Sequence, residues 1–544
     1  MPTPIGIDLG TCTSEITVFD NGQCKTFVDD TADSSPVVPS VVAYDPKTSE
    51  LKVGAAAEAL PDCIREAKRK MGLVGEEARC STGGEDFTPE EVGSFILKHL
   101  KKIAENQMFG ETINDVILTV PAIFSEKARV ATMTAGQLAG LNIIQLINEP
   151  VAAAIYYADL ARDKWKGNKT LFVFDFGGGT LDFSVCQKVG NVINFVCTGG
   201  DAKLGGKDID EMLMAYVTKK FVKDHPSAKL SETVKIKEAF KKASILCKKT
   251  LSNSQNGNIY VGAFATKDGE PIDLDIVISR DEFNERVLEN SPIDGVDSII
   301  KRIKVSLNNL FNQNSEKIDK KDIDYLLFVG GSSYIPYVQE MLKKYLGIDG
   351  KQVDGKQAFC HEPNLAVSRG AAIYAADQAI LNSENPEETG VQFGRDPGGV
   401  MTVYARSPHG IGCQITDKPT GKHIYSQWFP PQQPIPFEGS FDYRLLEPDQ
   451  TSVRFGVYQS TIDKDGQPIE DTEFTGCENQ IVNIPPTTDG TCREVKVKVQ
   501  YDKNGLLTAT ITIPSTGQSM ELKHQVNARV TDASRRRVAE FTRS

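Results

Sequence analysis

One short pattern occurs twice in the sequence, and it restricts the possible folds more than any other feature. Residues 5–19 read IGIDLGTCTSEITVF, and residues 172–186 read FVFDFGGGTLDFSVC. Each copy has an apolar strand that leads into an aspartate, a turn with glycine and a second strand. Aligned on those aspartates, the copies pair Asp8 with Asp175, Gly10 with Gly177, Thr13 with Thr180 and Glu15 with Asp182. Two hairpins of one design predict a duplicated structure with two related lobes.

The glycine turns indicate a site for a phosphorylated ligand. Because glycine has no side chain, the backbone N–H groups of such a turn can approach an anion closely. The aspartate that ends each first strand can hold a hydrated Mg²⁺, which needs few carboxylates and keeps several waters. A single copy would be read as an ordinary turn, but two copies and a third glycine turn at Gly330 and Gly331 favour a polyphosphate site. The motif G-x-x-x-x-G-K-[ST] occurs nowhere in the sequence, so a P-loop is excluded.

The order of predicted elements divides the chain into two kinds of structure. Up to about residue 380, strands alternate with helices, which is typical of an α/β architecture. Ser125 is expected to cap one of these helices and Pro150 to start another. Beyond the Pro- and Gly-rich segment 383–399, residues 494–513 alternate with a period of two around Asn504 and Gly505, as in a β-hairpin. The predicted division is an α/β domain at 1–382, a linker at 383–399, a β-sandwich at 400–530 and a short tail or helix at 531–544.

Composition excludes several classes of function. The chain has 544 residues, too many for one core when a domain takes about 150. Its net charge of −12 argues against nonspecific nucleic-acid binding, which needs a basic surface. The eleven cysteines form no C-x-x-C pair and predict reduced thiols in the cytoplasm. No apolar run approaches about 18 residues, and strand sequence starts near the N-terminus, so neither a membrane span nor a signal peptide is expected.

With these segments established, the chain resembles the DnaK-type chaperones, the seventy-kilodalton heat-shock family. The resemblance covers residues 5–376 and is carried, in order, by IGIDLGT, REAKRKMG, ILTVPAIFSEKARVATMTAGQLAGLNIIQLINEPVAAAIYY, FVFDFGGGTLDFSV, GGDAKLGGKDID, LLFVGGSSYIP and EPNLAVSRGAAIYAA. The long segment with Asn148, Glu149 and Pro150 separates this family from actin and the sugar kinases, which share its fold. The C-terminal segments SPHGIG, QTSVRFGVYQ and IPPTTDGTCREVKVKVQYDKNGLLTATI are similar to the family's peptide-binding β-sandwich.

The resemblance implies a two-lobed, duplicated α/β actin-like ATPase fold followed by an all-β sandwich. It implies an ATP-dependent chaperone in which slow ATP hydrolysis is coupled to binding of extended apolar peptides. The expected ligands are ATP or ADP and Mg²⁺, with K⁺ as a further candidate, and the expected partners are unfolded polypeptides and J-domain and nucleotide-exchange co-chaperones. The alternative is a nucleotide-binding scaffold with one dedicated partner. A sugar kinase is disfavoured, because those enzymes do not end in a β-sandwich.

The same resemblance assigns roles to individual residues. Asp8, Glu149 and Asp175 would surround the magnesium ion and its waters. Catalysis would fall to Lys68, Glu149, Thr180 and Asp182, with Lys68 reaching the γ-phosphate and the attacking water. Nucleotide binding is assigned to Gly10, Thr11, Cys12, Gly177, Gly178, Gly179, Gly205, Gly206, Lys248, Lys249, Ser252, Gly330, Gly331, Ser332, Tyr334 and Asn364. Peptide binding is assigned to Cys413, Phe441, Val453 and Phe455.

The sequence departs from the family in four regions. In the peptide groove, Cys413, Thr416 and Arg444 stand where the family tends to place larger or purely apolar groups. Lys249 and Tyr334 occupy the positions of two adenine-stacking arginines, so ATP binding is expected to be weaker although a tyrosine still stacks. The segment GGVMTVYARSP lacks the family's acidic-leucine strip, yet it can dock as an extended strand, and Pro121 and Arg129 stand where the family relays a signal between domains. After the sandwich only TDASRRRVAEFTRS remains in place of a helical lid, so bound peptide is expected to leave quickly.

Overall fold

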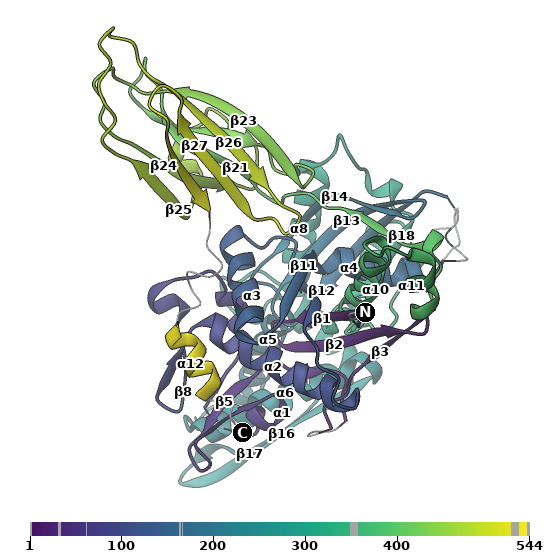
Figure 1. Ribbon diagram of the computed structural model, residues 1–544. Coiled ribbons are helices and arrows are strands. Elements are labelled where there is room, and N and C mark those ends of the chain that lie inside the picture. The colour runs from purple at the N-terminus through teal and green to yellow at the C-terminus, as the bar shows by residue number, and fades with distance from the viewer. Residues whose placement is uncertain are drawn as a thin grey trace.

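The computed structural model describes residues 3–30, 34–60, 62–162, 165, 167–348, 357–523 and 532–540. Two mixed β-sheets with helices packed on them form the larger part of the molecule, and two antiparallel sheets form an elongated module at one end (Figure 1). Within these residues, no helix combines the length and the apolar character needed to cross a bilayer.

The first lobe is built on a six-stranded sheet with the strand order β11-β10-β1-β2-β3, and β4 pairs with β2. Its strands are β1 (Ile5–Leu9), β2 (Thr13–Asp20), β3 (Gln23–Thr26), β4 (Val38–Pro39), β10 (Asp115–Val120) and β11 (Asn142–Asn148). Helices α2 (Pro89–Gln107) and α3 (Glu126–Leu138) share its core. Ser125 caps α3 as predicted, since its hydroxyl accepts the Ala128 N–H at 3.4 Å. Smaller elements complete the lobe: β5 (Val42–Asp45), β6 (Glu50–Val53), α1 (Ala55–Glu58), β7 (Cys63–Ile64), β8 (Cys80–Thr82) and β9 (Glu85–Phe87).

The second lobe repeats this plan with the strand order β19-β18-β12-β13-β14-β20. Its strands are β12 (Lys169–Phe176), β13 (Leu181–Val189), β14 (Val192–Asp201), β18 (Tyr325–Val329), β19 (Gln357–Phe359) and β20 (Thr402–Tyr404). The helices are α5 (Gly206–Asp224), α6 (Val234–Asn253), α7 (Arg280–Phe283), α8 (Ile299–Gln313) and α9 (Pro336–Tyr345), with a small sheet of β15 (Lys229–Leu230), β16 (Asn256–Lys267) and β17 (Glu270–Ser279).

The two lobes are duplicates in pairing as well as in strand order. In each, the hairpin is antiparallel and its first strand also pairs in parallel with a later strand, β10 for β1 and β18 for β12. Helices α4 (Glu149–Leu160) and α10 (Ala366–Leu381) share one core with strands of both sheets. They approach so closely that a Cβ at Gly370 would lie 1.7 Å from the Ala152 carbonyl oxygen. The predicted two-lobed, duplicated actin-like fold is confirmed.

The segment predicted as a linker is partly helical. Helix α11 (Pro386–Phe393) begins after the Asn385 cap and ends at Gly394, whose φ of 67° is left-handed. Arg395 then forms a buried ion pair with Asp377 of α10. The chain continues into β20, which pairs in parallel with β14 as the edge strand of the second sheet. The segment therefore docks on the second sheet as an extended strand. This strand falls inside the range 400–530 that was predicted for the sandwich. The domain boundaries remain a prediction.

The C-terminal module consists of two four-stranded antiparallel sheets, ordered β22-β21-β24-β25 and β23-β26-β27-β28. Its strands are β21 (Gly410–Thr416), β22 (His423–Phe429), β23 (Phe437–Arg444), β24 (Val453–Ser460), β25 (Glu473–Ile481), β26 (Glu494–Tyr501), β27 (Leu507–Ile513) and β28 (Gln518–Lys523). The predicted hairpin joins β26 to β27, with Gly505 at φ 74° in its turn. Apolar residues of both sheets fill the space between them, as expected for a β-sandwich.

The last described element, α12 (Asp532–Glu540), lies on the first lobe beside α2 and α3 (Figure 1). Val538 is buried in the core of that lobe. The guanidinium of Arg537 lies 4.7 Å from the centre of the Phe87 ring. The predicted short tail or helix is therefore a helix that packs on the first lobe.

Candidate functional site

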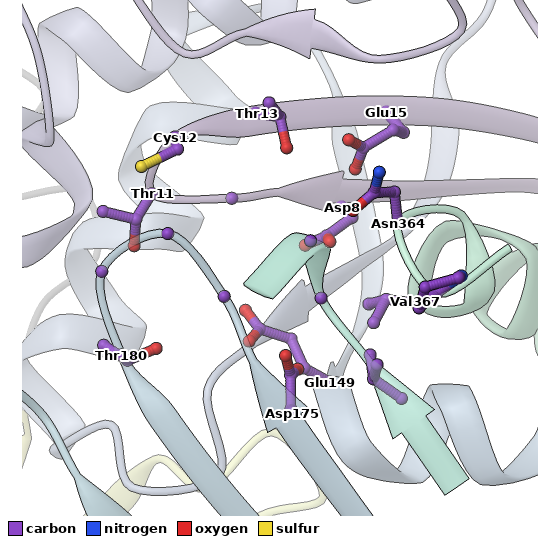
Figure 2. Close-up of a pocket in the computed structure, with 18 of the residues that line it drawn as sticks. Asp8, Thr11, Cys12, Thr13, Glu15, Glu149, Asp175, Thr180, Asn364 and Val367 are labelled. Atoms are coloured by element: carbon purple, nitrogen blue, oxygen red, sulfur yellow. The ribbon is translucent and has the colours of Figure 1, made fainter. Parts of the chain in front are cut away.

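The two hairpin turns face one another across a pocket between the lobes (Figure 2). Of the residues assigned from the sequence, the pocket is lined by Asp8, Gly10, Thr11, Cys12, Lys68, Glu149, Asp175, Gly177, Gly178, Gly179, Thr180, Gly330, Gly331 and Asn364. The walls also include five residues that the sequence did not assign, Thr13, Glu15, Val329, Pro363 and Val367. The structure thus brings together most of the predicted phosphate and metal residues.

The glycines of the second hairpin are needed for close packing as well as for backbone access. A Cβ at Gly178 would lie 2.2 Å from the Cys12 Sγ, and one at Gly205 would lie 2.5 Å from the Gly179 nitrogen. The carbonyl of Gly177 accepts the Gly206 N–H at 3.0 Å and the Ser332 hydroxyl at 2.9 Å. Gly205, Gly206 and Ser332 therefore support the turn from behind and do not line the pocket.

Four carboxylates line the pocket, Asp8, Glu15, Glu149 and Asp175. Burial disfavours their charged forms and is the main reason that the pKa of Glu149 rises to about 7 and that the pKa values of Asp8, Glu15 and Asp175 are also raised. Repulsion adds to this effect, since Glu149 raises the pKa of Asp175 and Asp8 raises that of Glu15. These groups would be stabilised in their charged forms by a cation.

Lys68 is the one ammonium group among the residues that line the pocket. It lies in the short 3-10 helix η1 (Ala67–Lys70) and forms a buried ion pair with Glu149. Burial lowers the pKa of Lys68, but the carboxylates of Glu149 and Asp8 outweigh that effect, and the net pKa is raised. The lysine is therefore charged at neutral pH.

Asp182 lies behind the second turn, on β13 opposite Asp175. It is 1% exposed, and burial raises its pKa to about 6, while the nearby Thr180 side chain and the Lys68 ammonium act in the opposite direction. Asp182 is not among the residues that line the pocket. Its assigned partner Thr180 does line it, so the two residues connect the pocket wall to a buried carboxylate.

Of the residues assigned to the adenosine side, Lys248, Lys249, Ser252 and Tyr334 lie outside the walls of this pocket, and Asn364 lies in them. Lys248 is held by Asp210, with Nζ 2.8 Å from Oδ1, and by the Gly206 carbonyl at 2.8 Å. Lys249 and Tyr334 are exposed, and Ser252 is partly buried on α6. Asn364 lines the pocket beside Gly331, where an added Cβ would lie 3.0 Å from its Oδ1. The adenosine assignments stay predictions.

Three further residues at the site were not assigned from the sequence. Glu15 and Thr13 line the pocket at the positions that the hairpin alignment pairs with Asp182 and Thr180, so the internal repeat was the signal that could have identified them. Arg69 donates from Nη2 to the Gly179 carbonyl oxygen, and no local sequence signal distinguishes it from an exposed helix residue.

The pocket fits a polyphosphate with a hydrated divalent cation. Its backbone turns leave no room for a side chain at Gly10, Gly178 or Gly179. Its oxygen ligands are the hard donors that Mg²⁺ prefers. In the described part of the chain, no three His, Cys, Asp or Glu side chains are grouped so as to hold a metal ion directly. An ion that keeps most of its waters and contacts one or two carboxylates matches this arrangement.

Comparison with protein families agrees with this site. A family model described as Hsp70 protein matches residues 4–78 and 75–542, nearly the whole chain. The chain belongs to the Hsp70 family. Members of that family are ATPases and chaperones that bind ATP or ADP with Mg²⁺, unfolded polypeptides and co-chaperones.

In this Hsp70-family chain the sandwich docks on the first lobe at α3. Arg129 of α3 donates from Nη1 to the Asn504 carbonyl at 3.3 Å and from Nη2 to Asn148 Oδ1 at 2.8 Å. Glu126 Oε1 accepts the Leu507 N–H at 2.8 Å. Asn148 immediately precedes Glu149, so a continuous set of hydrogen bonds links the sandwich hairpin to the residue beside the pocket. Pro121, named with Arg129 from the sequence, directly follows β10.

The residues assigned to peptide binding divide into two groups. Cys413 is fully buried and Phe455 is 5% exposed, and both belong to the core of the sandwich. Phe441 and Val453 are partly buried and pack against that core. Their role in peptide binding by this Hsp70-family chain stays a prediction.

Proposed function

We propose that this Hsp70-family chain is an ATP-dependent chaperone of the DnaK type. It hydrolyses ATP slowly in the two-lobed domain and binds extended apolar segments of unfolded polypeptides with the sandwich. J-domain and nucleotide-exchange proteins are its expected co-chaperones, and protein folding under stress in the cytoplasm is its expected setting. The observation that carries this proposal is the pocket itself, because paired glycine turns, buried carboxylates and a charged lysine meet in it.

Each pocket residue has a role that follows from its position. The turns of Gly10 and Gly177 to Gly179 would bind phosphates through backbone N–H groups. Asp8, Glu149 and Asp175 would hold the Mg²⁺ through its waters, and the bound ion would neutralise charge on the phosphates. Lys68 would stabilise charge on the terminal phosphate, which is the main requirement of phosphoryl transfer. Thr180 and Asp182 would orient the attacking water.

The contact between the sandwich and the first lobe supports coupling between the two activities. A shift of Asn504 would change the hydrogen bonds of Arg129, and Arg129 holds Asn148 at the start of α4. Since Glu149 follows Asn148 and pairs with Lys68, peptide binding and hydrolysis would share this link. Coupling of this kind needs an equilibrium between two states that both nucleotide and peptide shift. The docked and undocked positions of the sandwich would be these two states.

A second candidate function is favoured by the interior of the sandwich. The Tyr443 hydroxyl lies between the sheets, accepts the Trp428 Nε1–H at 3.0 Å and is 3.0 Å from the Ser426 hydroxyl. The Cys413 thiol also donates to it, at 3.6 Å. Two residues assigned to the peptide groove are involved. Cys413 belongs to this polar cluster, and the Phe455 ring centre lies 6.1 Å from that of Tyr443. A nucleotide-stabilised scaffold with a dedicated partner would need no open groove there.

Single-turnover hydrolysis of Mg-ATP distinguishes the two functions. The purified full chain is compared with Lys68→Ala, each with and without an excess of an extended apolar peptide. Loss of the charged group that faces the phosphates is expected to slow hydrolysis by at least about 100-fold. Lys70→Ala is the matched control, because Lys70 lies in the same short helix η1 but does not line the pocket.

Slow hydrolysis that Lys68→Ala abolishes and peptide accelerates supports the coupled chaperone. Nucleotide binding without hydrolysis, indifferent to peptide, supports the scaffold. If hydrolysis by Lys68→Ala equals that of the control, the proposed role of Lys68 is wrong.

A further inference from the structure

Arg69 joins the two lobes at the second glycine turn, and the roles above leave it without a function. It lies in η1 of the first lobe, directly after Lys68. Its Nη2 donates to the carbonyl oxygen of Gly179, which belongs to the second lobe. The Arg69 side chain is 23% exposed. A hydrogen bond from a charged donor is stronger where water is largely excluded, so this bond is a substantial link between the lobes.

Two carboxylates hold the guanidinium of Arg69 in place. Its Nη1 lies 3.6 Å from Glu66 Oε2, and its Nη2 lies 3.8 Å from Asp208 Oδ2. Glu66 belongs to the first lobe and also pairs with Lys207 of the second, with 3.0 Å between Nζ and Oε2. The φ of Glu66 is 58°, a left-handed conformation that is uncommon for residues other than glycine. The chain therefore maintains a strained backbone at the residue that orients the arginine.

Helix α5 of the second lobe fixes the first two carbonyls of the same turn. The Gly206 N–H donates to the Gly177 carbonyl at 3.0 Å, and the Lys207 N–H donates to the Gly178 carbonyl at 2.9 Å. The next carbonyl, that of Gly179, is bonded by the arginine of the other lobe. The first two bonds lie within one lobe and would persist if the lobes separated, whereas the third would be lost.

The peptide unit that Arg69 holds is the one that ends in the Thr180 nitrogen. The Gly179 carbonyl and the Thr180 N–H belong to one planar unit, so a hydrogen bond to the carbonyl also fixes the direction of the N–H. Thr180 lines the pocket. In Figure 2 the turn before Thr180 lies against Thr11 and Cys12 of the first hairpin. Arg69 thus orients a backbone N–H in the turn that is proposed to bind phosphate.

We infer that Arg69 is a positioning residue for nucleotide binding: it reaches from the first lobe and holds the turn of the second lobe in the conformation that binds the phosphates. The inference rests on the proposed nucleotide binding. Arg69 is not among the residues that line the pocket, so it acts through the turn and not by contact with the ligand. The competing explanation is that Arg69 only helps to keep the lobes closed, as any ion pair between them would.

Binding of Mg-ADP and of adenosine to the full chain, both measured by calorimetric titration, separates the two explanations. Adenosine lacks the phosphates that the turn would bind, so a variant that disturbs only the turn weakens Mg-ADP and spares adenosine. Arg69→Met keeps the length of the side chain and removes its donors, and Arg69→Lys keeps the charge and a donor. Arg79→Met is the matched control in the same lobe, because the Arg79 side chain is 51% exposed. Lys207→Met removes the ion pair with Glu66 and leaves the bond to Gly179.

Arg69→Met should bind Mg-ADP at least about 10-fold more weakly than wild type, because it loses a hydrogen bond from a charged donor. Its adenosine affinity should be unchanged, Arg69→Lys should recover part of the loss, and Arg79→Met should behave as wild type.

Three results would overturn the inference: unchanged Mg-ADP affinity in Arg69→Met, equal losses for Mg-ADP and adenosine, or a loss that Lys207→Met reproduces in full. Glu66→Gln is a second, milder variant in case Arg69→Met folds poorly, since it removes the carboxylate that orients the guanidinium. It should also weaken Mg-ADP and spare adenosine, and equal losses for both ligands would again overturn the inference. Failure of wild type to bind Mg-ADP overturns the proposed function instead.

Discussion

At the scale of the residue, Gly178 gives the sharpest test of the phosphate turn. A methyl group there would lie 2.2 Å from the Cys12 Sγ, far inside contact distance, so Gly178→Ala must displace either turn. Overpacking of this kind costs about 1–3 kcal/mol, which would weaken nucleotide binding roughly 5- to 150-fold. Gly177→Ala should cost less, since its methyl meets only the Thr180 carbonyl oxygen, at 3.7 Å. Calorimetric titration with Mg-ADP measures both.

Removal of the Cys12 side chain should reverse the loss of nucleotide affinity caused by Gly178→Ala. Cys12→Gly in the Gly178→Ala background takes away the Sγ and Cβ that the new methyl would meet, so affinity is expected to recover in part. Equal affinity of Gly178→Ala and wild type would show that the turn at Gly178 does not pack against Cys12.

The same residues indicate how far the sequence predicts the site. The internal repeat predicted that Asp8, Asp175 and the glycines of the two turns lie close together, and they line one pocket, because each is positioned by a local hairpin. It also paired Glu15 with Asp182, yet nothing local says that Glu15 is buried beside Asp8. Arg69 reaches Gly179 through contact between residues 110 apart in the chain. Such contacts depend on how the lobes close, which local sequence does not specify.

At the scale of the element, the segment between α10 and the sandwich acts as an ordered connector. Residues 383–399 were predicted as a linker because of their Pro, Gly and charged residues. The same residues contain helix signals, an Asn385 cap, Pro386 at the first position and Gly394 in the left-handed conformation. Compositional signals for a linker and capping signals for a short helix overlap, and tertiary contacts such as Arg395 with Asp377 decide between them.

A charged side chain buried directly before β20 should detach this strand from β14. Met401 is 4% exposed and its N–H donates to the Asp377 carboxylate at 2.9 Å. Met401→Asp would bury a second carboxylate there, and an unpaired buried charge costs several kcal/mol. We expect trypsin cleavage after Arg406 to become at least about 10-fold faster, which corresponds to about 1.4 kcal/mol. Tyr404→Asp, three residues later at the end of β20, is the matched control, because Tyr404 is 57% exposed. Similar cleavage of both variants would contradict the docking of β20.

At the scale of the whole molecule, docking of the sandwich buries two titratable groups with opposite effects. Glu126 lies under the sandwich, and burial raises its pKa from 4.5 to about 8. His409 of the sandwich is within 3.3 Å of the Ile123 carbonyl, and burial lowers its pKa from 6.5 to about 4. Tyr501 also faces this contact, but burial raises its pKa to about 12, outside the physiological range. Docking therefore depends on pH through Glu126 and His409.

The signs of the two effects define a window in which Glu126 acts alone. If Glu126 has its ordinary pKa when undocked, docking takes up a proton between pH 4.5 and 8, so docking weakens as pH rises through that range. His409 weakens docking only below about pH 6.5, where the undocked imidazole becomes charged. Between about pH 6.5 and 8 we expect docking to lose roughly 1–2 kcal/mol. Small-angle scattering of the full chain should show a larger radius of gyration at pH 8. Glu126→Gln should remove this dependence while Glu111→Gln keeps it, and an unchanged pH profile in Glu126→Gln would rule out Glu126 as its origin.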